Sequence, residues 1–246
     1  MTRNFSVGVE CTRIPRVGGN LVADSVDWGG SSITLDAAEH FAARVPVSPA
    51  ERGRIARTLY DFPMECQVRG MFFQGLVDTI SRAADRSTSD RLLTEAGVHT
   101  RFIPFVLMPH RDFYKLYFLA SATLFPRSPL EQGFERIAED FYPTFKESMV
   151  GRTLSAFIGK EPVTILERLA QAYQMSIPWN EHSVRKDGPQ GAIWSCKVEP
   201  SELYPATFKG IVRGTMRAHG VSEPWVSLVD ERREDHAKRF EFRVRW

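Results

Sequence analysis

Four residues are the first candidates for chemistry in this chain of 246 residues. Arg69 and Arg152 each adjoin a glycine within an apolar stretch, where a guanidinium can bind an anionic ligand or a buried carboxylate. Trp179 and His182 fall in a short segment before a candidate strand, and together they could line a pocket. These are the candidate ligand-binding residues, and none of them completes a catalytic pattern.

Each candidate also has a structural interpretation, which we favour. An arginine between apolar positions can pair with a carboxylate on a neighbouring helix. The segment around Trp179 and His182 can be a surface loop that is anchored by its tryptophan. If Arg69 and Arg152 faced one cavity, anion binding would become the better interpretation, but spacing in the sequence does not decide this.

The histidines and cysteines show no spacing that is typical of a metal site. No two of the six histidines lie three or four residues apart, the spacing that places two ligands on one helix face. Cys11, Cys66 and Cys196 lie far apart, form no C-x-x-C pair and suit buried thiols in a reducing compartment. The sequence predicts neither a metal site nor a disulfide, and it leaves the identity of any cofactor open.

Motifs of the common hydrolases are absent. The sequence contains no G-x-G-x-x-G, H-E-x-x-H or G-x-S-x-G, and Gly70 and Gly75 are not followed by the Lys-Ser/Thr of a phosphate-binding loop. The formal net charge of +2 disfavours nucleic acid as a partner, because such binding depends on many contacts from Lys and Arg to phosphate. Without a signal peptide or a membrane-spanning apolar run, we expect a cytoplasmic protein.

The chain divides into an N-terminal extension, residues 1–60, and a main domain, residues 61–246. Gly, Val and Ser dominate the start of the extension, and residues 32–35 predict a short strand. Two helices follow it in the extension. We expect that deletion of residues 1–47 leaves residues 61–246 folded.

Apolar residues recur at steps of three and four over much of the chain up to residue 175, which predicts amphipathic helices. Pro143 is expected to kink or split its helix, and Gly70 and Gly75 indicate close packing against a neighbour. The expected N-terminal caps are Asp36, Ser48, Asp112 and Ser128. The predicted helices span residues 36–44, 48–60, 68–83, 90–96, 112–124, 128–157 and 162–173.

After residue 175 the apolar period changes, and it becomes strict alternation in the last segment, the pattern of a strand with one buried face. The charge-balanced run 230–235 predicts a solvated hairpin loop. The predicted elements are strands over 193–198, 224–230 and 240–246, with a helix over 204–219. The sequence therefore predicts an α+β fold, a helical layer packed on a small antiparallel sheet.

Three stretches together resemble a paralogous family of uncharacterised proteins found mainly in myxobacteria. They are Val68–Leu76, Phe145–Leu154 with its GRTL sequence, and Tyr204–Val212. The resemblance covers about residues 61–246, leaves out the N-terminal extension and names no activity.

The order of the elements, ending in strand Phe242–Trp246, is also similar to a superfamily. Its members are heme-nitric-oxide-binding domains, 4-vinyl-reductase-like domains and vesicle-trafficking subunits, which are small-ligand sensors or dimerising interaction modules. This resemblance would imply heme or a metal for some members. No position here matches a proximal heme histidine, and the metal-binding cysteines are missing near the last two strands.

The resemblance and the missing catalytic motifs favour a non-enzymatic regulatory or signalling module. It would bind a small ligand or a partner protein and form a homodimer. The alternative is an enzyme or a cofactor-carrying protein with an apolar pocket, which the phenylalanine-rich helices could line. Ordinary core packing is the competing explanation for the 17 phenylalanines.

Overall fold

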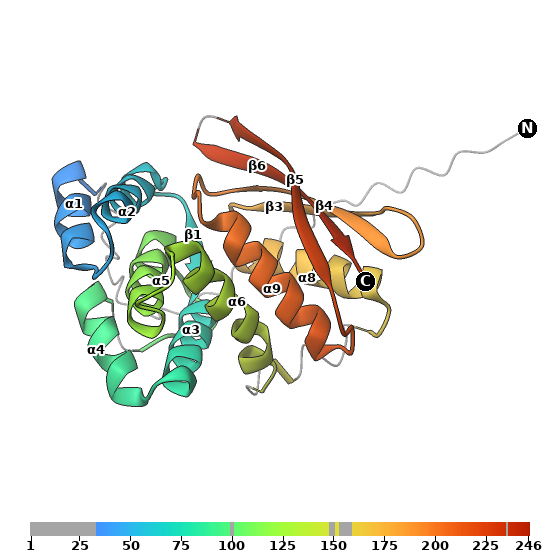
Figure 1. Ribbon diagram of the computed structural model, residues 1–246, viewed down its shortest axis with the longest axis horizontal. Helices are drawn as coiled ribbons and strands as arrows, with labels where there is room; N and C mark the ends of the chain where they lie inside the picture. The colour runs from blue at the N-terminus through green and yellow to red at the C-terminus, as the bar shows by residue number, and fades with distance from the viewer. Residues whose placement is uncertain (1–32, 99–100, 148–150, 153–158, 235) are drawn as a thin grey trace, which may run out of the picture.

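The computed structural model describes residues 33–98, 101–147, 151–152, 159–234 and 236–246. It confirms the α+β fold: a helical half is followed by a four-stranded antiparallel sheet that packs against helices (Figure 1). Two expectations lie outside the described residues, namely the start of the extension and the helical pattern around residues 153–157.

The helical half also contains a pair of three-residue strands, which the sequence did not predict because three residues are too few to show alternation. The strand expected over residues 32–35 is wrong at its described positions. Ile33 and Thr34 form no strand, and the Thr34 hydroxyl caps a helix by accepting a hydrogen bond from the Ala37 N–H. The elements are α1 (Leu35–Arg44), α2 (Pro49–Asp61), β1 (Gln67–Arg69), α3 (Gly70–Ala83), α4 (Arg86–Ala96), β2 (Leu107–Pro109), α5 (His110–Leu124) and α6 (Leu130–Glu147).

Helix boundaries follow the capping side chains, but they differ in three places from the boundaries and caps that the sequence predicts. Thr34 replaces the expected cap of α1, and α5 begins at His110, so that Asp112 lies in its first turn. Helix α4 begins before residue 90 because Asp85 caps it, accepting a hydrogen bond from the Thr88 N–H at 2.7 Å. Helix α6 is not split, since it continues through Pro143 to Glu147.

The second half consists of α8 (Pro162–Ser176), β3 (Glu181–Lys186), β4 (Gly191–Val198), α9 (Tyr204–Ala218), β5 (Trp225–Glu234) and β6 (Ala237–Arg245). The strand order is β3-β4-β6-β5, and every pair is antiparallel. Strand β3 was missed because its residues are mostly polar and exposed. The hairpin loop expected over residues 230–235 is wrong for residues 230–234, which belong to the exposed edge strand β5.

Two hydrophobic clusters make up most of the core. The larger one joins α1–α6 and includes Phe73, Phe118 and Phe134. The smaller one lies between the sheet and helices α8 and α9, where the rings of Phe208 and Phe242 stack with centroids 4.0 Å apart. Helix α6 lies between the two halves (Figure 1). Side chains that lie between the two halves are therefore held in place by the larger cluster on one side and by the smaller cluster on the other.

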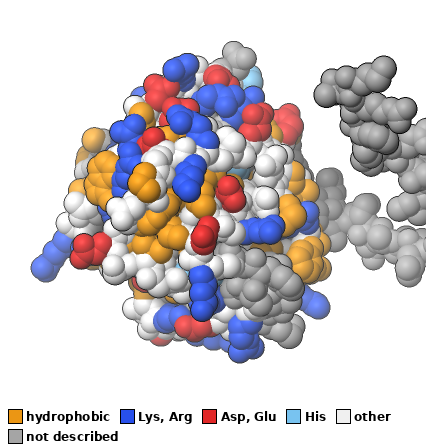
Figure 2. Space-filling model, turned by 90° about the vertical axis from the view of Figure 1, so that its right-hand side faces the viewer, with side chains coloured by type: hydrophobic (Ala, Val, Ile, Leu, Met, Phe, Trp, Pro, Cys, Tyr) orange, Lys and Arg blue, Asp and Glu red, His pale blue; other side chains and the backbone are white. Residues whose placement is uncertain are grey.

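The surface carries mixed charge. Figure 2 shows one face on which Lys and Arg side chains lie among Asp and Glu, with hydrophobic side chains gathered between them. This face offers no continuous basic area of the kind that nucleic-acid binding uses. Among the described helices, none combines the length and the apolar character needed to cross a bilayer.

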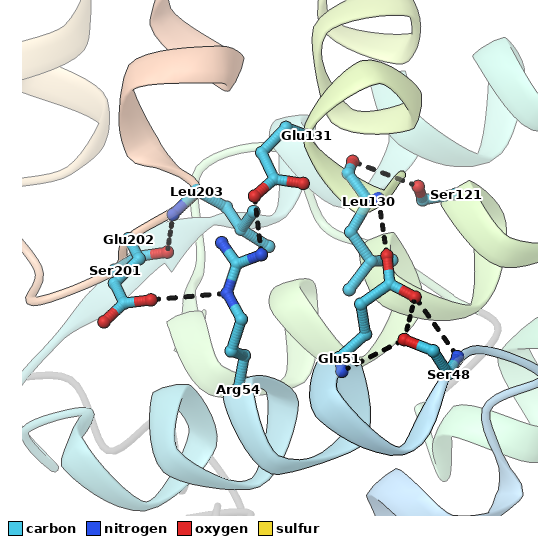
Figure 3. Close-up of polar contacts among 9 residues, drawn as sticks. All are labelled: Ser48, Glu51, Arg54, Ser121, Leu130, Glu131, Ser201, Glu202 and Leu203. Carbon is cyan, nitrogen blue, oxygen red and sulfur yellow. Dashed lines mark hydrogen bonds and ion pairs between the residues drawn. The ribbon is translucent and has the colours of Figure 1, made fainter. Parts of the chain in front are cut away.

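Helix α2 is tied to two segments that are distant in the sequence (Figure 3). Glu51 completes the predicted capping box with Ser48 and also accepts a hydrogen bond from the Leu130 N–H at 3.0 Å, at the start of α6. Arg54 pairs with Glu131 at 2.5 Å and with Glu202 at 3.3 Å. Polar contacts thus connect the predicted extension to both halves of the molecule.

Candidate functional site

An apolar cleft of about 400 Å³ lies where α3, α6, α8 and α9 meet. Aromatic and aliphatic side chains form most of its wall, among them Phe72, Phe141, Leu169 and Tyr173. The volume falls within the range of about 300–1,000 Å³ that is usual for small-molecule sites. The cleft can therefore enclose a small apolar molecule.

Arg69 lies at this cleft and is held by two backbone carbonyls. Its Nε donates to the Met175 oxygen at 2.8 Å, and its Nη1 donates to the Phe105 oxygen at 2.7 Å. No described carboxylate pairs with Arg69, so the ion pair that we favoured from the sequence is not found. Both acceptors are uncharged carbonyls, so neither of them offsets the positive charge of the guanidinium beside the apolar space.

A smaller cavity of about 40 Å³ lies deeper between the two halves. Phe72, Phe141 and Tyr173 line both spaces, while His110 and Glu199 line the inner cavity alone. One buried water needs about 10–15 Å³ by this measure, so the inner cavity has room for water-sized species and is too small for a drug-sized ligand.

Beside the inner cavity, the structure brings together three buried side chains that can bind metal ions. One donor atom each from Cys66, His110 and Glu199 lies within 4.8 Å of the others. The Cys66 Sγ is 3.3 Å from His110 Nδ1, which in turn is 4.0 Å from Glu199 Oε2. Tyr114 orients the carboxylate by donating its hydroxyl hydrogen to Glu199 Oε1 at 2.7 Å.

Burial governs the protonation of this cluster. It raises the pKa of the Cys66 thiol well above its usual value, and the nearby Glu199 charge raises it further. Burial also lowers the pKa of the His110 imidazole, which the Glu199 charge opposes. These directions favour a neutral thiol beside a neutral imidazole, the imidazole form that can coordinate a metal.

The pairing of β1 with β2 places two of these residues side by side. Gln67 lies opposite Pro109, and the pairing continues one position further, where the His110 N–H donates to the Cys66 carbonyl at 3.0 Å. Glu199 directly follows β4, so the sheet half supplies the third donor. Sequence reasoning missed this group because its members are 44 and 89 residues apart and both strands are very short.

The structure places the residues proposed from the sequence on different elements. Arg69 lines the cleft, whereas Trp179 packs against the larger hydrophobic cluster. His182 lies on β3 and not in a loop; its Nδ1 accepts a hydrogen bond from the Trp194 Nε1–H at 3.2 Å. Arg152 lies in a helical turn at residues 151–152, with residues outside the described part of the chain on both sides.

The fold is similar to those of solved H-NOX domains, each 14% identical to this chain. The structure of a protein in which porphyrin distortion modulates the heme redox potential has a TM-score of 0.60, and the match covers 72% of this chain and 99% of that one. An oxygen-binding H-NOX domain related to soluble guanylate cyclases has a TM-score of 0.60 and covers 72% and 94%. A T. tengcongensis H-NOX mutant has a TM-score of 0.57 and covers 72% and 96%. At this identity the likeness shows the fold alone.

Heme does not fit the spaces between the described residues. The inner cavity of about 40 Å³ is far too small for a porphyrin, although His110 lines it. Among the described residues that line the outer cleft there is neither histidine nor cysteine, two of the usual axial ligands of heme. Burial raises the pKa of its two tyrosines, Tyr142 and Tyr173, which disfavours a tyrosinate ligand.

A comparison with curated proteins finds no match. The sequence profile of one family does match, over residues 64–246, which is most of the chain and nearly all of the predicted main domain. The match begins just after α2 and includes Arg69 and the three clustered donors. The chain belongs to this family, which is described as a protein of unknown function (DUF2378).

Proposed function

We propose that this chain is a non-enzymatic signalling module that binds a small molecule in the cleft beside Arg69. The observation that carries this proposal is the apolar cleft of about 400 Å³, in which Arg69 is the one charged residue among the described lining residues. Such a site suits an apolar body with one anionic group, such as a fatty or aromatic carboxylic acid.

The placement of Arg69 supports an acidic ligand. Two carbonyls orient the guanidinium, so that a ligand meets a fixed cation and little side-chain entropy is lost on binding. Phe105 and Met175 beside it are 63% and 64% exposed, which leaves apolar surface for a ligand to cover. The fold likeness to an oxygen-binding relative of guanylate cyclases supports a sensory role.

We also propose that the protein is cytoplasmic and forms a homodimer, as expected from the sequence. Native mass spectrometry of gently purified protein reports the oligomeric state and any bound small molecule in one experiment. A coloured protein with visible absorbance would instead favour the alternative of a cofactor-carrying protein.

Two variants of α8 test the cleft directly. Ala172 lines the cleft, and Ala172→Phe fills part of it, whereas Gln171→Phe adds the same ring at the exposed neighbouring position. The probe is 1-anilinonaphthalene-8-sulfonate, which is apolar and anionic. We expect Ala172→Phe and Arg69→Gln to weaken its binding at least tenfold, about 1.4 kcal/mol, and Gln171→Phe to leave it unchanged. Equal binding by all of these proteins would reject the cleft as a ligand site.

A further inference from the structure

Cys66, His110 and Glu199 have the donor types and the spacing of a zinc site. Zinc takes sulfur, nitrogen and oxygen ligands at about 2.0–2.3 Å, so two donors of a tetrahedral site lie about 3.3–3.7 Å apart. The Sγ–Nδ1 separation is 3.3 Å, the Nδ1–Oε2 separation is 4.0 Å, and all three donor atoms lie within 4.8 Å of one another. Small side-chain movements that shorten the longer separations would bring all three donors within bonding distance of one ion.

The charge of this cluster also points to a cation. Glu199 is 2% exposed, and the nearest described basic group is the His110 ring, 4.0 Å away. No described lysine or arginine pairs with it. A buried carboxylate without a counter-charge is costly. One divalent ion with one thiolate, one carboxylate and a neutral imidazole has no net charge, which removes that cost.

Two further observations indicate a ligand at this place. Asn180 is 2% exposed and donates from Nδ2 to Glu199 Oε2 at 3.4 Å, yet its Oδ1 is buried with no partner among the described atoms. Such an orphaned oxygen indicates a species that protein atoms do not supply. In addition, His110 and Glu199 line the cavity of about 40 Å³, which has room for a water on the open side of the ion.

We propose that Cys66, His110 and Glu199 bind one Zn²⁺ ion whose fourth position faces the inner cavity. Binding forms one bond each from zinc to Sγ, Nδ1 and a carboxylate oxygen, and it releases the thiol proton to solvent without any change of oxidation state. Three protein ligands with an open fourth position are the arrangement of zinc sites that bind a water or a small ligand. The site joins the helical half to the sheet half and does not depend on the occupant of the outer cleft.

The test uses the full chain, stripped with a chelator and titrated with Zn²⁺ and then with Co²⁺. We expect one equivalent of zinc by elemental analysis and a thiolate-to-cobalt charge-transfer band. Cys66→Ser and Glu199→Gln should lose the band and the stoichiometric zinc. The control variant Cys196→Ser should keep both, because Cys196 is buried in the other cluster, between the sheet and helices α8 and α9.

A matched pair of tyrosines keeps the test informative if the ligand variants fail to fold. Tyr114 donates to Glu199, whereas Tyr117 is equally buried and donates to the Phe134 carbonyl. Loss of a hydrogen bond that orients a ligand typically weakens metal binding about 10–100-fold, so Tyr114→Phe should do so and Tyr117→Phe should not. A wild-type chain that takes up no stoichiometric zinc, or zinc that stays bound in Cys66→Ser, would overturn the proposal.

Discussion

Individual partly buried side chains contribute to the response of this protein to acid. His182 packs beside Tyr173 and Trp194, and burial lowers its pKa to about 4. In an unfolded chain the same imidazole titrates near the ordinary histidine value of about 6.5. The unfolded state therefore takes up more protons than the folded state between these two values, and acid favours unfolding there.

We expect the free energy of unfolding to fall by about 2 kcal/mol as the pH is lowered from 7 toward 4, in part through His182. The variant His182→Gln keeps a side chain that can accept the hydrogen bond from Trp194 but cannot titrate. Urea unfolding at several pH values should therefore show a weaker pH dependence for this variant than for the wild type. Identical pH profiles would contradict a buried neutral imidazole at position 182.

Glu51 acts in the same direction as His182, at lower pH. Burial opposes its ionisation, but hydrogen bonds from the Ser48 hydroxyl and from the N–H groups of Leu130 and Ser48 outweigh burial and lower its pKa. Its stabilising contribution is thus present at neutral pH and is lost as the pH falls through the lowered pKa. We expect Glu51→Gln to cost about 1–2 kcal/mol near pH 7, the cost of a lost helix cap, and much less at acid pH. The control is Glu39→Gln, at an exposed position of α1. Thermal melts at neutral and acid pH measure the stability of the two variants.

At the scale of elements, the contact of α6 with α9 depends on glycine. A Cβ at Gly210 or Gly214 would collide with the backbone carbonyls of Glu135 and Glu139 on α6. Arg213 and Arg217 on α9 pair with the same two glutamates. Because glycine has no side chain, the two helices can approach each other closely at Gly210 and Gly214. The two ion pairs lie beside that contact.

We expect Gly214→Ala to destabilise the fold by about 1–3 kcal/mol, because the new methyl group meets backbone that has no room to move. The matched control is Gly53→Ala in α2, where a Cβ meets nothing within 4 Å. That control should be neutral or stabilising by up to about 1 kcal/mol. Denaturant titration of the two variants separates overpacking from helix propensity; a Gly214→Ala variant as stable as wild type would disprove the close approach.

On the scale of the whole molecule, helices α1 and α2 are continuous with the larger core. Ala38 and Phe41 of α1 and Ile55 of α2 lie in the same hydrophobic cluster as Phe73 and Phe134. The family profile begins at residue 64 and leaves both helices out. The helices thus lie outside the family match but share its core.

Deletion of residues 1–47 removes α1 and keeps the α2 contacts of Glu51 and Arg54. We expect residues 48–246 to unfold cooperatively, at a lower melting temperature because Phe41 and its neighbours no longer cover the core. Calorimetry measures both properties. Loss of the cooperative transition would show that α1 is an integral part of the domain and not an extension.

The sequence by itself determined the fold class, most helices and the strands near residues 193–198, 224–230 and 240–246. These elements are long enough for the period of apolar residues to reveal them. It also indicated the close packing at Gly70 and Gly75, where a Cβ would meet the Ile103 carbonyl and the Phe141 ring.

Only the tertiary structure decided which side chains meet. Arg69 reached the cleft through contacts with Phe105 and Met175, 36 and 106 residues away. Cys66, His110 and Glu199 came together because two three-residue strands pair and because β4 ends beside them. Local periodicity reports which face of an element is buried, but it holds no information on which distant elements share that buried space.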